Sequence, residues 1–398
     1  MIIALGAGRD APSELRARLA LDEDGQRKVL RASRPGVGEL AILCTCHRTE
    51  VYATADGAEA DAVHVIAGLL PGLRPTDQHD LRFMDGAEAI EHLFRVACGL
   101  DSLVVGEPQV LAQVRRSYVL AQQEGAAGPV LSNVFGRAIH LGKRARTETP
   151  LGRLGQSIGT IAASYLASRF GTLEGRRGAV VGAGMAATDA ALSLRSAGAK
   201  LQVVSRSSAA AERLARRADA TVHPLDDLPG VLLDAEFAVV AVSGGMLVRP
   251  PHLPRGNGSD PFIVLDLSVP RAVDVDEVEG VELRSLEEIP GPRGPEVTSA
   301  LIDAEALVRK EVAELERWLD TRASGPVIRD LRARAELMVR EEVARTISGM
   351  RLSPDDHERI ASLAMRITNK LLHGPTAALR DADEETRELI SRLFGLEP

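Results

Sequence analysis

A stretch near the middle of the chain, residues 177–197, limits the possible fold more than any other. It consists of an apolar strand, a turn with the pattern Gly182-x-Gly184-x-x-Ala187, and a helical segment. Glycines let a backbone approach a pyrophosphate closely, and the first N–H groups of a helix can bind that group. The stretch therefore predicts the opening half of a dinucleotide-binding βαβ unit. Its predicted cofactor-binding residues are Gly182, Ala183, Gly184, Met185, Ala186 and Ala187.

The next apolar strand, residues 201–204, indicates which dinucleotide the unit prefers. It ends in Ser205-Arg206-Ser207-Ser208, where an NAD site usually carries an acidic residue that holds the ribose hydroxyls. Hydroxyl groups and a guanidinium instead suit the additional phosphate of NADP. We therefore predict NADPH as the cofactor, with Ser205 and Arg206 as further contacts. Apolar strands at 237–242 and 262–267 continue the pattern of a parallel sheet.

The composition is that of a globular protein with more than one domain. The chain has 398 residues, with 45% hydrophobic and 26% charged residues, enough for two or three cores. Its three cysteines cannot form a disulfide framework, which indicates a reducing, cytoplasmic location. No second Cys/His cluster supplies zinc ligands, so no metal site is predicted. The sequence contains no uninterrupted run of about 18 apolar residues, so no membrane span is predicted.

The charge distribution leaves room for a nucleic acid only at a local site. A formal net charge of -8 argues against a general nucleic-acid-binding surface. The densest basic segment is His140 to Arg146, which suits either phosphate contacts or an ordinary solvated helix face. Both interpretations remain open from the residues alone.

The stretch from Ala41 to Tyr52 contains the most reactive side chains. An apolar run ends in Cys44-Thr45-Cys46-His47-Arg48, as when a buried strand delivers a reactive group to a site at its end. Cys46 and Arg48 lie on one face wherever the backbone stays extended, and His47 faces away unless the chain turns. The guanidinium would favour the thiolate or clamp a substrate carboxylate. The alternative is a pair of buried core cysteines.

A polar passage follows between two predicted helices, at residues 99–113. Glycine and proline bracket short polar insertions here, which predicts a kinked connection. Such a connection can point Ser102, Glu107, Gln109 and Gln113 into one cavity. Helix caps are the alternative interpretation of these side chains.

The chain from Val297 onward is predicted to be helical. Apolar residues trace one face of a first helix, with Ser299 as its N-cap and Gly325-Pro326 as its interruption. A later helix is predicted to end at His373, before Gly374-Pro375. A helical module on a spacer helix usually serves self-association.

Together these residues make the chain similar to the glutamyl-tRNA reductase family, the first enzymes of the C5 route to tetrapyrroles. The resemblance covers nearly the full length. The matching blocks are Thr45-Cys46-x-Arg48-Thr49-Glu50, His92 to Ser102, Gly106-Glu107-Pro108-Gln109 to Gln113, Gly142-Lys143-Arg144, the dinucleotide turn, Asp266-x-x-Val269-Pro270-Arg271 and Asn369 to His373.

The resemblance implies an α/β fold class and a homodimer. It implies an N-terminal α/β catalytic domain that binds glutamyl-tRNA at 1–150 and a Rossmann-like NADPH-binding domain at 151–290. A long spinal helix at 291–325 and a helical dimerisation domain at 326–398 would follow. Glutamate-1-semialdehyde aminomutase is a further implied partner.

The resemblance also implies the chemistry. Cys46 would be the nucleophile that takes the glutamyl group from tRNA as a thioester, and NADPH would reduce this thioester to glutamate 1-semialdehyde. His92 matches the family's activity-sensitive histidine, which the residues alone would place on a helix surface or in a core. The implied substrate-binding residues are Thr45, His47, Arg48, Ser102, Glu107, Pro108, Gln109 and Gln113.

Some residues depart from the family pattern. A histidine and a threonine usual near the start are missing from Leu5 to Pro12, which here includes Gly8 and Asp10. His47 replaces the usual asparagine after the nucleophile, and the dinucleotide turn ends in Ala187. Two alternatives therefore stay open: a paralogous reductase of another aminoacyl-tRNA or acyl thioester, and a non-catalytic binding or regulatory homologue.

Overall fold

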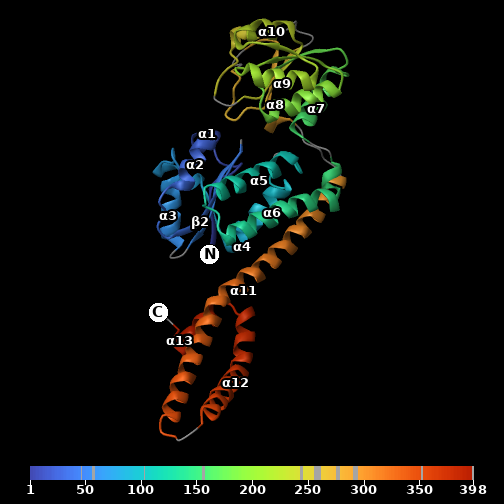
Figure 1. The fold of residues 1–398 in the computed structure, drawn as a ribbon. Coiled ribbons are helices and arrows are strands. Elements are labelled where there is room, and N and C mark those ends of the chain that lie inside the picture. The colour runs from blue at the N-terminus through green and yellow to red at the C-terminus, as the bar shows by residue number, and fades with distance from the viewer. Residues whose placement is uncertain are drawn as a thin grey trace. The chain divides into compact units, whose positions relative to one another are not determined.

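The computed structural model describes residues 1–45, 47–55, 59–102, 104–154, 157–242, 245–254, 261–274, 278–289, 295–350 and 353–396 (Figure 1). The chain divides into two units, Met1–Arg309 and Lys310–Pro398. The first unit contains both sheets of the described chain, and the second is helical.

The N-terminal part of the first unit is built on a four-stranded antiparallel sheet. Its strands lie in the order β2-β3-β1-β4. They are β1 (Ile2–Ala7), β2 (Val37–Cys44), β3 (Thr49–Ala55) and β4 (Arg82–Asp85). The helices are α1 (Ser13–Leu19), α2 (Glu23–Arg31), α3 (Glu59–Leu69), α4 (Gly86–Cys98), α5 (Pro108–Gln123) and α6 (Pro129–Glu148), with 3-10 turns η1 (Pro75–Asp80) and η2 (Pro150–Arg153).

Apolar strand residues explain why this sheet forms. All six residues of β1 are buried, and Leu40 to Leu43 of β2 are at most 1% exposed. Aromatic rings join the sheet to the helices, since Tyr52 of β3 meets Phe135 of α6 edge to face at 5.7 Å between ring centroids. The first helix, α1, begins at Ser13, and Pro12 occupies its N-cap position.

The second sheet of this unit has six parallel strands in the order β10-β9-β8-β5-β6-β7. The strands are β5 (Arg177–Val181), β6 (Lys200–Val204), β7 (Thr221–His223), β8 (Phe237–Val240), β9 (Phe262–Asp266) and β10 (Val281–Ser285). The helices are α7 (Ile158–Phe170), α8 (Met185–Ser196), α9 (Ser208–Ala218) and α10 (Leu228–Asp234), with 3-10 turns η3 (Leu225–Asp227), η4 (Pro250–His252) and η5 (Leu286–Glu288).

The parallel sheet confirms the predicted Rossmann-like fold. Ala179, Val180 and Val181 of β5 have no exposed surface, as expected for a central strand covered on both faces. The chain moves from β5 outward to β6 and β7, then returns to β8 on the other side of β5. Ligands of such sheets bind at the carboxyl edge where the strand order reverses, which here is the end of β5.

The second unit consists of long helices. They are α11 (Pro295–Ile347), which begins in the first unit, α12 (Pro354–Ala378) and α13 (Glu384–Phe394), with η6 (Leu379–Asp381) between the last two. At 53 residues α11 is about 80 Å long at ~1.5 Å per residue. The N-cap predicted at Ser299 is wrong, because α11 already begins at Pro295.

The predicted interruptions of these helices are also wrong. Pro326 lies inside α11 and Pro375 lies inside α12. A proline within a helix removes one hydrogen bond and costs about 3 kcal/mol. Packing beyond the prolines offsets this loss, because Leu331 and Leu379 are buried in a cluster with Val327 and Ile328.

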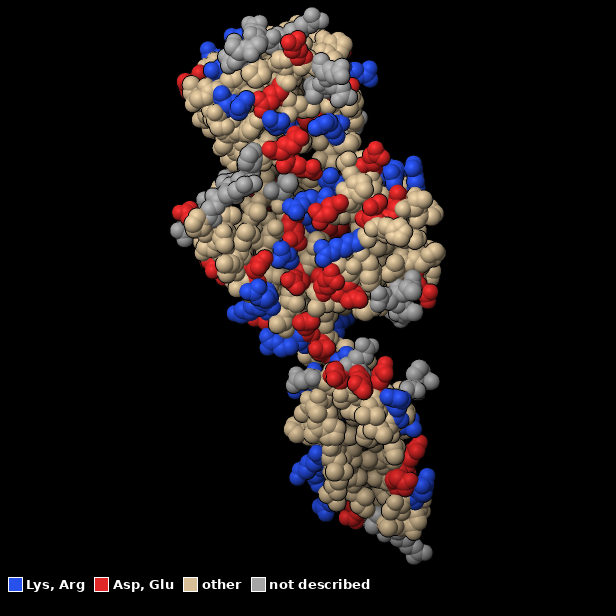
Figure 2. Space-filling view, turned by 180° about the vertical axis from the view of Figure 1, so that it is seen from behind, with Lys and Arg blue, Asp and Glu red and all other residues tan. Residues whose placement is uncertain are grey.

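The surface carries charges of both signs. Basic and acidic side chains are interspersed on the face shown in Figure 2. Within the basic segment on α6, Arg144 pairs with Glu148 at 2.8 Å, and half-buried Arg146 donates to the carbonyl oxygens of Ala97 and Glu107. The side chain of Arg146 therefore joins α6 to the backbone of neighbouring segments. Among the described helices, none combines the length and the apolarity needed to cross a membrane.

Candidate functional site

The thiol stretch forms the tight connection between β2 and β3. Cys44 at the end of β2 pairs with Thr49 at the start of β3. The N–H of Thr45 donates to the carbonyl of Arg48 at 2.8 Å, and Oγ1 of Thr45 accepts from the N–H groups of His47 and Arg48. The chain therefore turns at this point. Cys46 lies outside the described residues, so the predicted side-chain relation between Cys46 and Arg48 stays a prediction.

His47 is held neutral in this turn. Its ring is half-buried, and burial lowers its pKa to about 4, with further lowering by the charges of Arg16, Arg48 and Arg9. At neutral pH the ring is therefore an uncharged hydrogen-bonding group. A neutral imidazole can line a substrate pocket without pairing with the substrate's carboxylate.

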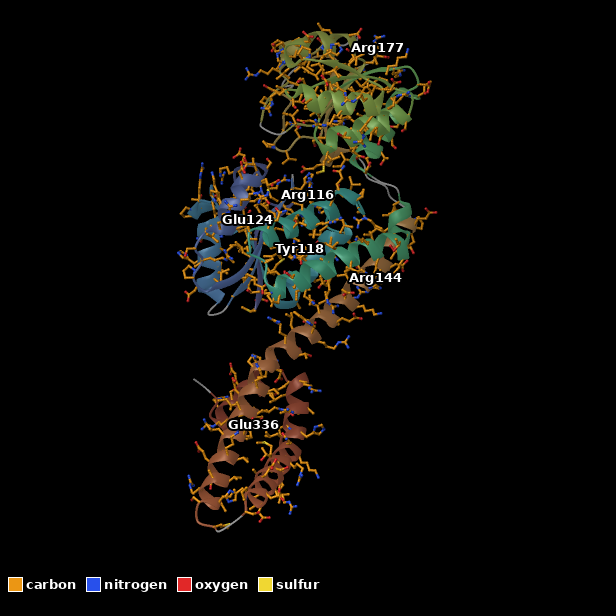
Figure 3. All side chains as sticks on the ribbon, in the orientation of Figure 1. Arg116, Tyr118, Glu124, Arg144, Arg177 and Glu336 are labelled. Atoms are coloured by element: carbon orange, nitrogen blue, oxygen red, sulfur yellow. The ribbon has the colours of Figure 1, made fainter. Side chains whose placement is uncertain are left out.

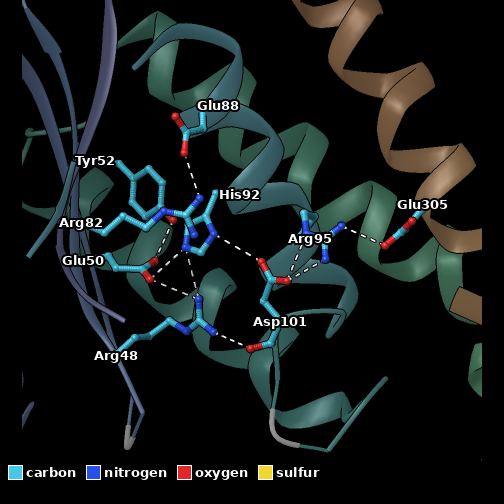
Figure 4. Close-up of polar contacts among 9 residues, drawn as sticks. All are labelled: Arg48, Glu50, Tyr52, Arg82, Glu88, His92, Arg95, Asp101 and Glu305. Atoms are coloured by element: carbon cyan, nitrogen blue, oxygen red, sulfur yellow. Dashed lines mark hydrogen bonds and ion pairs between the residues drawn. The ribbon is translucent and has the colours of Figure 1, made fainter. Parts of the chain in front are cut away.

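Arg48 is fixed by a network of buried charged groups (Figure 4). Its side chain is 4% exposed. Nη1 donates to Oε1 of Glu50 at 3.1 Å, and Nη2 donates to the backbone carbonyl of Asp101 at 2.8 Å. Glu50 lies on β3, next to the turn that carries Arg48, whereas Asp101 lies in the passage after α4. The guanidinium is thus oriented by two separate parts of the fold.

His92 of α4 lies between two carboxylates. Its Nε2 is 2.9 Å from Oε1 of Glu50, and its Nδ1 is 3.3 Å from Oδ2 of Asp101. Both ring nitrogens can donate only in the imidazolium form. Burial lowers the pKa of His92, but hydrogen bonds to Asp101 and Glu50 outweigh burial and raise the pKa overall. The geometry therefore favours a positively charged positioning residue over a neutral base.

The carboxylates of the network are strongly ionised. Burial alone would raise the pKa of Glu50, but Arg48 and His92 lower it to about 2. Tyr52 donates to the second oxygen of Glu50 at 2.8 Å. Burial is likewise outweighed at Asp101, where His92 and Arg95 lower the pKa to about 2.

The network extends to α11, because Arg95 pairs with Asp101 at 2.9 Å and with Glu305 at 3.0 Å. The sequence motifs predicted no role for Glu50, Tyr52, Asp101 or Arg95. Glu50 is the charged residue of the strand Thr49–Ala55, and this could have indicated the network, since a buried charge requires partners.

A narrow cavity of about 20 Å³ lies beside this network. It brings together Ser102, Glu107, Gln109 and Gln113, as the kinked passage predicted, with Thr45, His47 and Arg48. Pro108 does not line it and is the first residue of α5, where a missing N–H is tolerated. Burial raises the pKa of Glu107, opposed by a hydrogen bond with Ser102 and by Arg48. Glu107 therefore keeps its proton to a higher pH than an exposed glutamate.

A second cavity, of about 630 Å³, is lined both by the dinucleotide turn and by Cys44 and Thr45 at the end of β2. One wall consists of Gly182 to Ala186 with Ser205 to Ser207, and the other includes Thr45, Gln109 and Gln113. Arg116 lies on α5 (Figure 3). It also reaches the dinucleotide turn, since its Nη2 donates to the sulfur of Met185 at 3.3 Å. Ala187 does not line the cavity and is fully buried in the core beneath it.

The shape of this cavity fits a dinucleotide. At Gly182 the φ angle is +118°, and a Cβ would lie 2.2 Å from the carbonyl oxygen of Ala241, so only glycine fits there. A Cβ on Gly184 would meet no atom of the described residues within 4 Å and would project into open space. The N–H groups at the start of α8, which has no side-chain cap, are available to a phosphate.

A third cavity, of about 800 Å³, lies against the same network. Gly8 and Asp10, the positions that depart from the family pattern, line it together with Arg48, His92 and Asp101. The departures therefore lie beside the network. No group of three His, Cys, Asp or Glu residues in the described part of the chain has the arrangement of a metal site.

Comparisons with known proteins agree with this architecture. Residues 7–149 match the family model described as glutamyl-tRNAGlu reductase, N-terminal domain, and residues 303–396 match the dimerisation domain of the same enzyme. Residues 164–291 match the model described as shikimate / quinate 5-dehydrogenase.

The similarity to known proteins extends along nearly the whole chain. A glutamyl-tRNA reductase of Rubrobacter xylanophilus is 36% identical over 417 residues, which cover 98% of this chain and 97% of the relative. A glutamyl-tRNA reductase 2 of Nocardioides sp. is also 36% identical and covers 98% of this chain and 91% of its own. The structure of glutamyl-tRNA reductase from Methanopyrus kandleri has 26% identity, a TM-score of 0.53, and coverage of 99% and 97%.

Fold and site define an oxidoreductase in which a dehydrogenase-type domain for a nicotinamide cofactor is joined to a domain with a thiol-bearing turn. Within that class, the chain belongs to the glutamyl-tRNA reductase family. The resemblance drawn from the sequence motifs is confirmed.

Proposed function

We propose that the protein reduces glutamyl-tRNA(Glu) to glutamate 1-semialdehyde with NADPH, through a thioester on Cys46. This is the first step of 5-aminolevulinate and tetrapyrrole formation by the C5 route. The observation that carries the proposal is the cavity of about 630 Å³, which is lined both by the dinucleotide turn and by Thr45, the residue before Cys46.

The first step is an acyl transfer. The thiolate of Cys46 attacks the ester carbonyl carbon, a C–S bond forms, and the C–O bond to the terminal ribose breaks. The ribose oxygen of the departing tRNA takes up one proton, which balances the proton that the Cys46 thiol gave up when it became a thiolate. Bound NADPH would supply a hydride to the thioester carbonyl carbon, and the thiolate of Cys46 would then leave, which gives the aldehyde and the free enzyme. Sulfur suits this role because a thioester carbonyl accepts hydride more readily than an ester carbonyl does, and thiolate leaves well.

The protein's own residues would bind and orient the glutamyl group. Arg48 can pair with a carboxylate in the bidentate geometry that lysine lacks. Glu50 accepts from the guanidinium and holds it in place, and His92 in turn pairs with Glu50. Ser102, Glu107, Gln109 and Gln113 surround the space beside Arg48 and offer polar groups to a substrate.

Ser205 and Arg206 support the choice of NADPH over NADH. Both line the cavity at the end of β6, where the additional phosphate of NADPH would lie. The chain offers hydroxyl and guanidinium donors there and no carboxylate between Ser205 and Ser208.

We further propose a homodimer formed through the second unit. Its helices expose large apolar side chains, and its sequence matches a dimerisation domain. Leu371 and Leu393 are 71% and 70% exposed in the single chain, and a second copy would bury such residues. An aminomutase that takes up the semialdehyde is a further proposed partner, because an α-amino aldehyde is reactive in water.

The test has two parts. Protein mixed with glutamyl-tRNA and NADPH should form semialdehyde, and protein mixed with glutamyl-tRNA alone should carry a glutamyl adduct on Cys46 in mass spectra. Cys46→Ser should abolish both results. Cys44→Ser is the matched control and should retain most activity, because the Cys44 sulfur, although it lines the same cavity, hydrogen-bonds with Thr49 and with the N–H of Leu21, and serine can keep both bonds.

Other outcomes would favour the alternatives. Equal loss in both cysteine variants would refute the assignment of Cys46. An adduct with a different charged tRNA would indicate a paralogous reductase. The absence of any adduct would indicate a non-catalytic homologue.

A further inference from the structure

One buried cation has no part in the network around His92. Arg16 lies on α1, and its side chain is 7% exposed. Among the described residues, neither Nε nor Nη1 of Arg16 has a hydrogen-bond partner, although both atoms are buried. The remaining nitrogen, Nη2, lies 3.5 Å from Oε1 of Glu287 on η5. A buried guanidinium with two unpaired nitrogens is unfavourable unless an anion joins it.

Arg16 lines the cavity that contains the dinucleotide turn. Ala17 and Ala20 of the same N-terminal region also line it. Gly182 to Ala186 form another part of the same lining. The free donors of Arg16 and the free N–H groups at the start of α8 therefore border one space.

We propose that Arg16 binds the pyrophosphate of the dinucleotide cofactor, so that the N-terminal region completes the cofactor site. This inference rests on the proposed function. A guanidinium can donate two parallel hydrogen bonds to phosphate oxygens. The turn from Gly182 to Ala187 has no charged side chain of its own, and the Nη2 of Arg116, which reaches the turn from α5, donates to the sulfur of Met185.

The choice of pyrophosphate over the 2′-phosphate follows from the distribution of cations in the cavity lining. Arg206 already lies with two serines at the end of β6, the expected position of the 2′-phosphate. Arg16 is the other arginine in that lining of described residues. Assigning one arginine to each phosphate group gives each of them a cation.

The experiment compares the binding of NADPH and NADH, which share the pyrophosphate and differ in the 2′-phosphate. Dissociation constants are measured by calorimetry on the full chain. We expect Arg16→Met to weaken both nucleotides by a similar factor, about 10- to 100-fold, as for loss of hydrogen bonds to a charged group. Arg206→Ala should weaken NADPH and leave NADH unchanged. Arg16→Lys should restore part of the loss, because it keeps the charge without the paired donors.

Two controls separate binding from folding. The thermal midpoint of Arg16→Met without nucleotide should equal or exceed that of the wild type, because the variant buries no unpaired donor. Glu287→Gln removes the ion pair of Arg16 and should leave nucleotide binding unchanged or tighter. Weaker binding in Glu287→Gln to the same extent as in Arg16→Met would overturn the inference, since Arg16 would then act only through Glu287.

Three further outcomes of the binding experiment would each overturn a stated part of the inference. If the wild type binds NADPH and the dissociation constants of Arg16→Met are unchanged, Arg16 has no role in cofactor binding and the proposed function remains intact. Loss of NADPH affinity alone would move Arg16 to the 2′-phosphate and overturn the pyrophosphate assignment. Wild type that binds neither nucleotide would overturn the proposed function together with this inference.

Discussion

Replacement of Glu50 by glutamine provides a direct test of the buried network. Glu50 is 3% exposed and contacts Arg48, His92 and Tyr52. Its pKa falls from 4.5 to about 2 in the folded protein. At about 1.4 kcal/mol for each pKa unit, the ionised form gains roughly 3 kcal/mol from folding. Glu50→Gln keeps the shape and removes the charge, so the region should lose stability of about this size.

The sign of the pH dependence follows from the lowered pKa. The contribution of Glu50 is complete above its unfolded pKa of 4.5 and disappears as the pH falls through about 2. At pH 3 less than half of it should remain. The stability difference between wild type and Glu50→Gln should therefore be large at pH 7 and shrink toward pH 3.

The assay is hydrogen exchange at pH 7 on peptides from β3 and α4, with urea unfolding at pH 7, 5 and 3 for the pH dependence. Local exchange is preferred because a chain with several parts need not unfold in one transition. We expect exchange in these peptides to be roughly 100-fold faster in Glu50→Gln, as about 3 kcal/mol requires.

Glu88→Gln is the matched control, because Glu88 lies on α4, is 57% exposed and pairs with exposed Arg82 at 2.9 Å. An exposed pair of this kind contributes about 0 to 1 kcal/mol. Equal effects of Glu50→Gln and Glu88→Gln would refute the reasoning, because burial and charge pairing would then have no consequence at Glu50.

Two further predictions concern His92 and the dinucleotide turn. The His92 ring should titrate above 6.5 in NMR spectra, because Asp101 and Glu50 raise its pKa. Its contribution to stability is complete below 6.5 and should be lost as the pH rises through the raised pKa. Asp101→Asn should lower the titration midpoint, and an unchanged midpoint would contradict the imidazolium assignment. Gly184→Val should weaken NADPH binding in calorimetry with little change in thermal midpoint, since its side chain would enter the open cavity, whereas Gly182→Ala should lower the midpoint itself. A stable Gly182→Ala protein with normal binding would show that the turn is not constrained as described.

The buried network could not have been predicted from local sequence patterns. Glu50 and His92 are 42 positions apart, and their contact depends on how α4 packs against the sheet. A histidine on an amphipathic helix and a glutamate in a strand have many possible partners in a chain of 398 residues. Arg16 is a similar case, because its burial and its missing partners exist only in the folded chain.

The long helices show how packing overrides a local preference. Gly325-Pro326 predicts a break, since proline lacks an N–H donor and glycine is flexible. The chain nevertheless continues as one helix through Pro326, because the residues that follow are buried against Leu379 and its neighbours. The prediction failed because it considered one hydrogen bond and not the apolar surface beyond it.

The sequence by itself determined the elements whose signals are local. Strand, glycine turn and helix follow each other within about twenty residues at 177–197, so the dinucleotide fold could be read from order and spacing. The tertiary structure alone decided which charges meet: Arg48 with Glu50 and Asp101, His92 between two carboxylates, and Arg16 beside the cofactor cavity. The physical reason is that a buried charge is stable only with partners, and distant segments supply those partners once packing has brought them together.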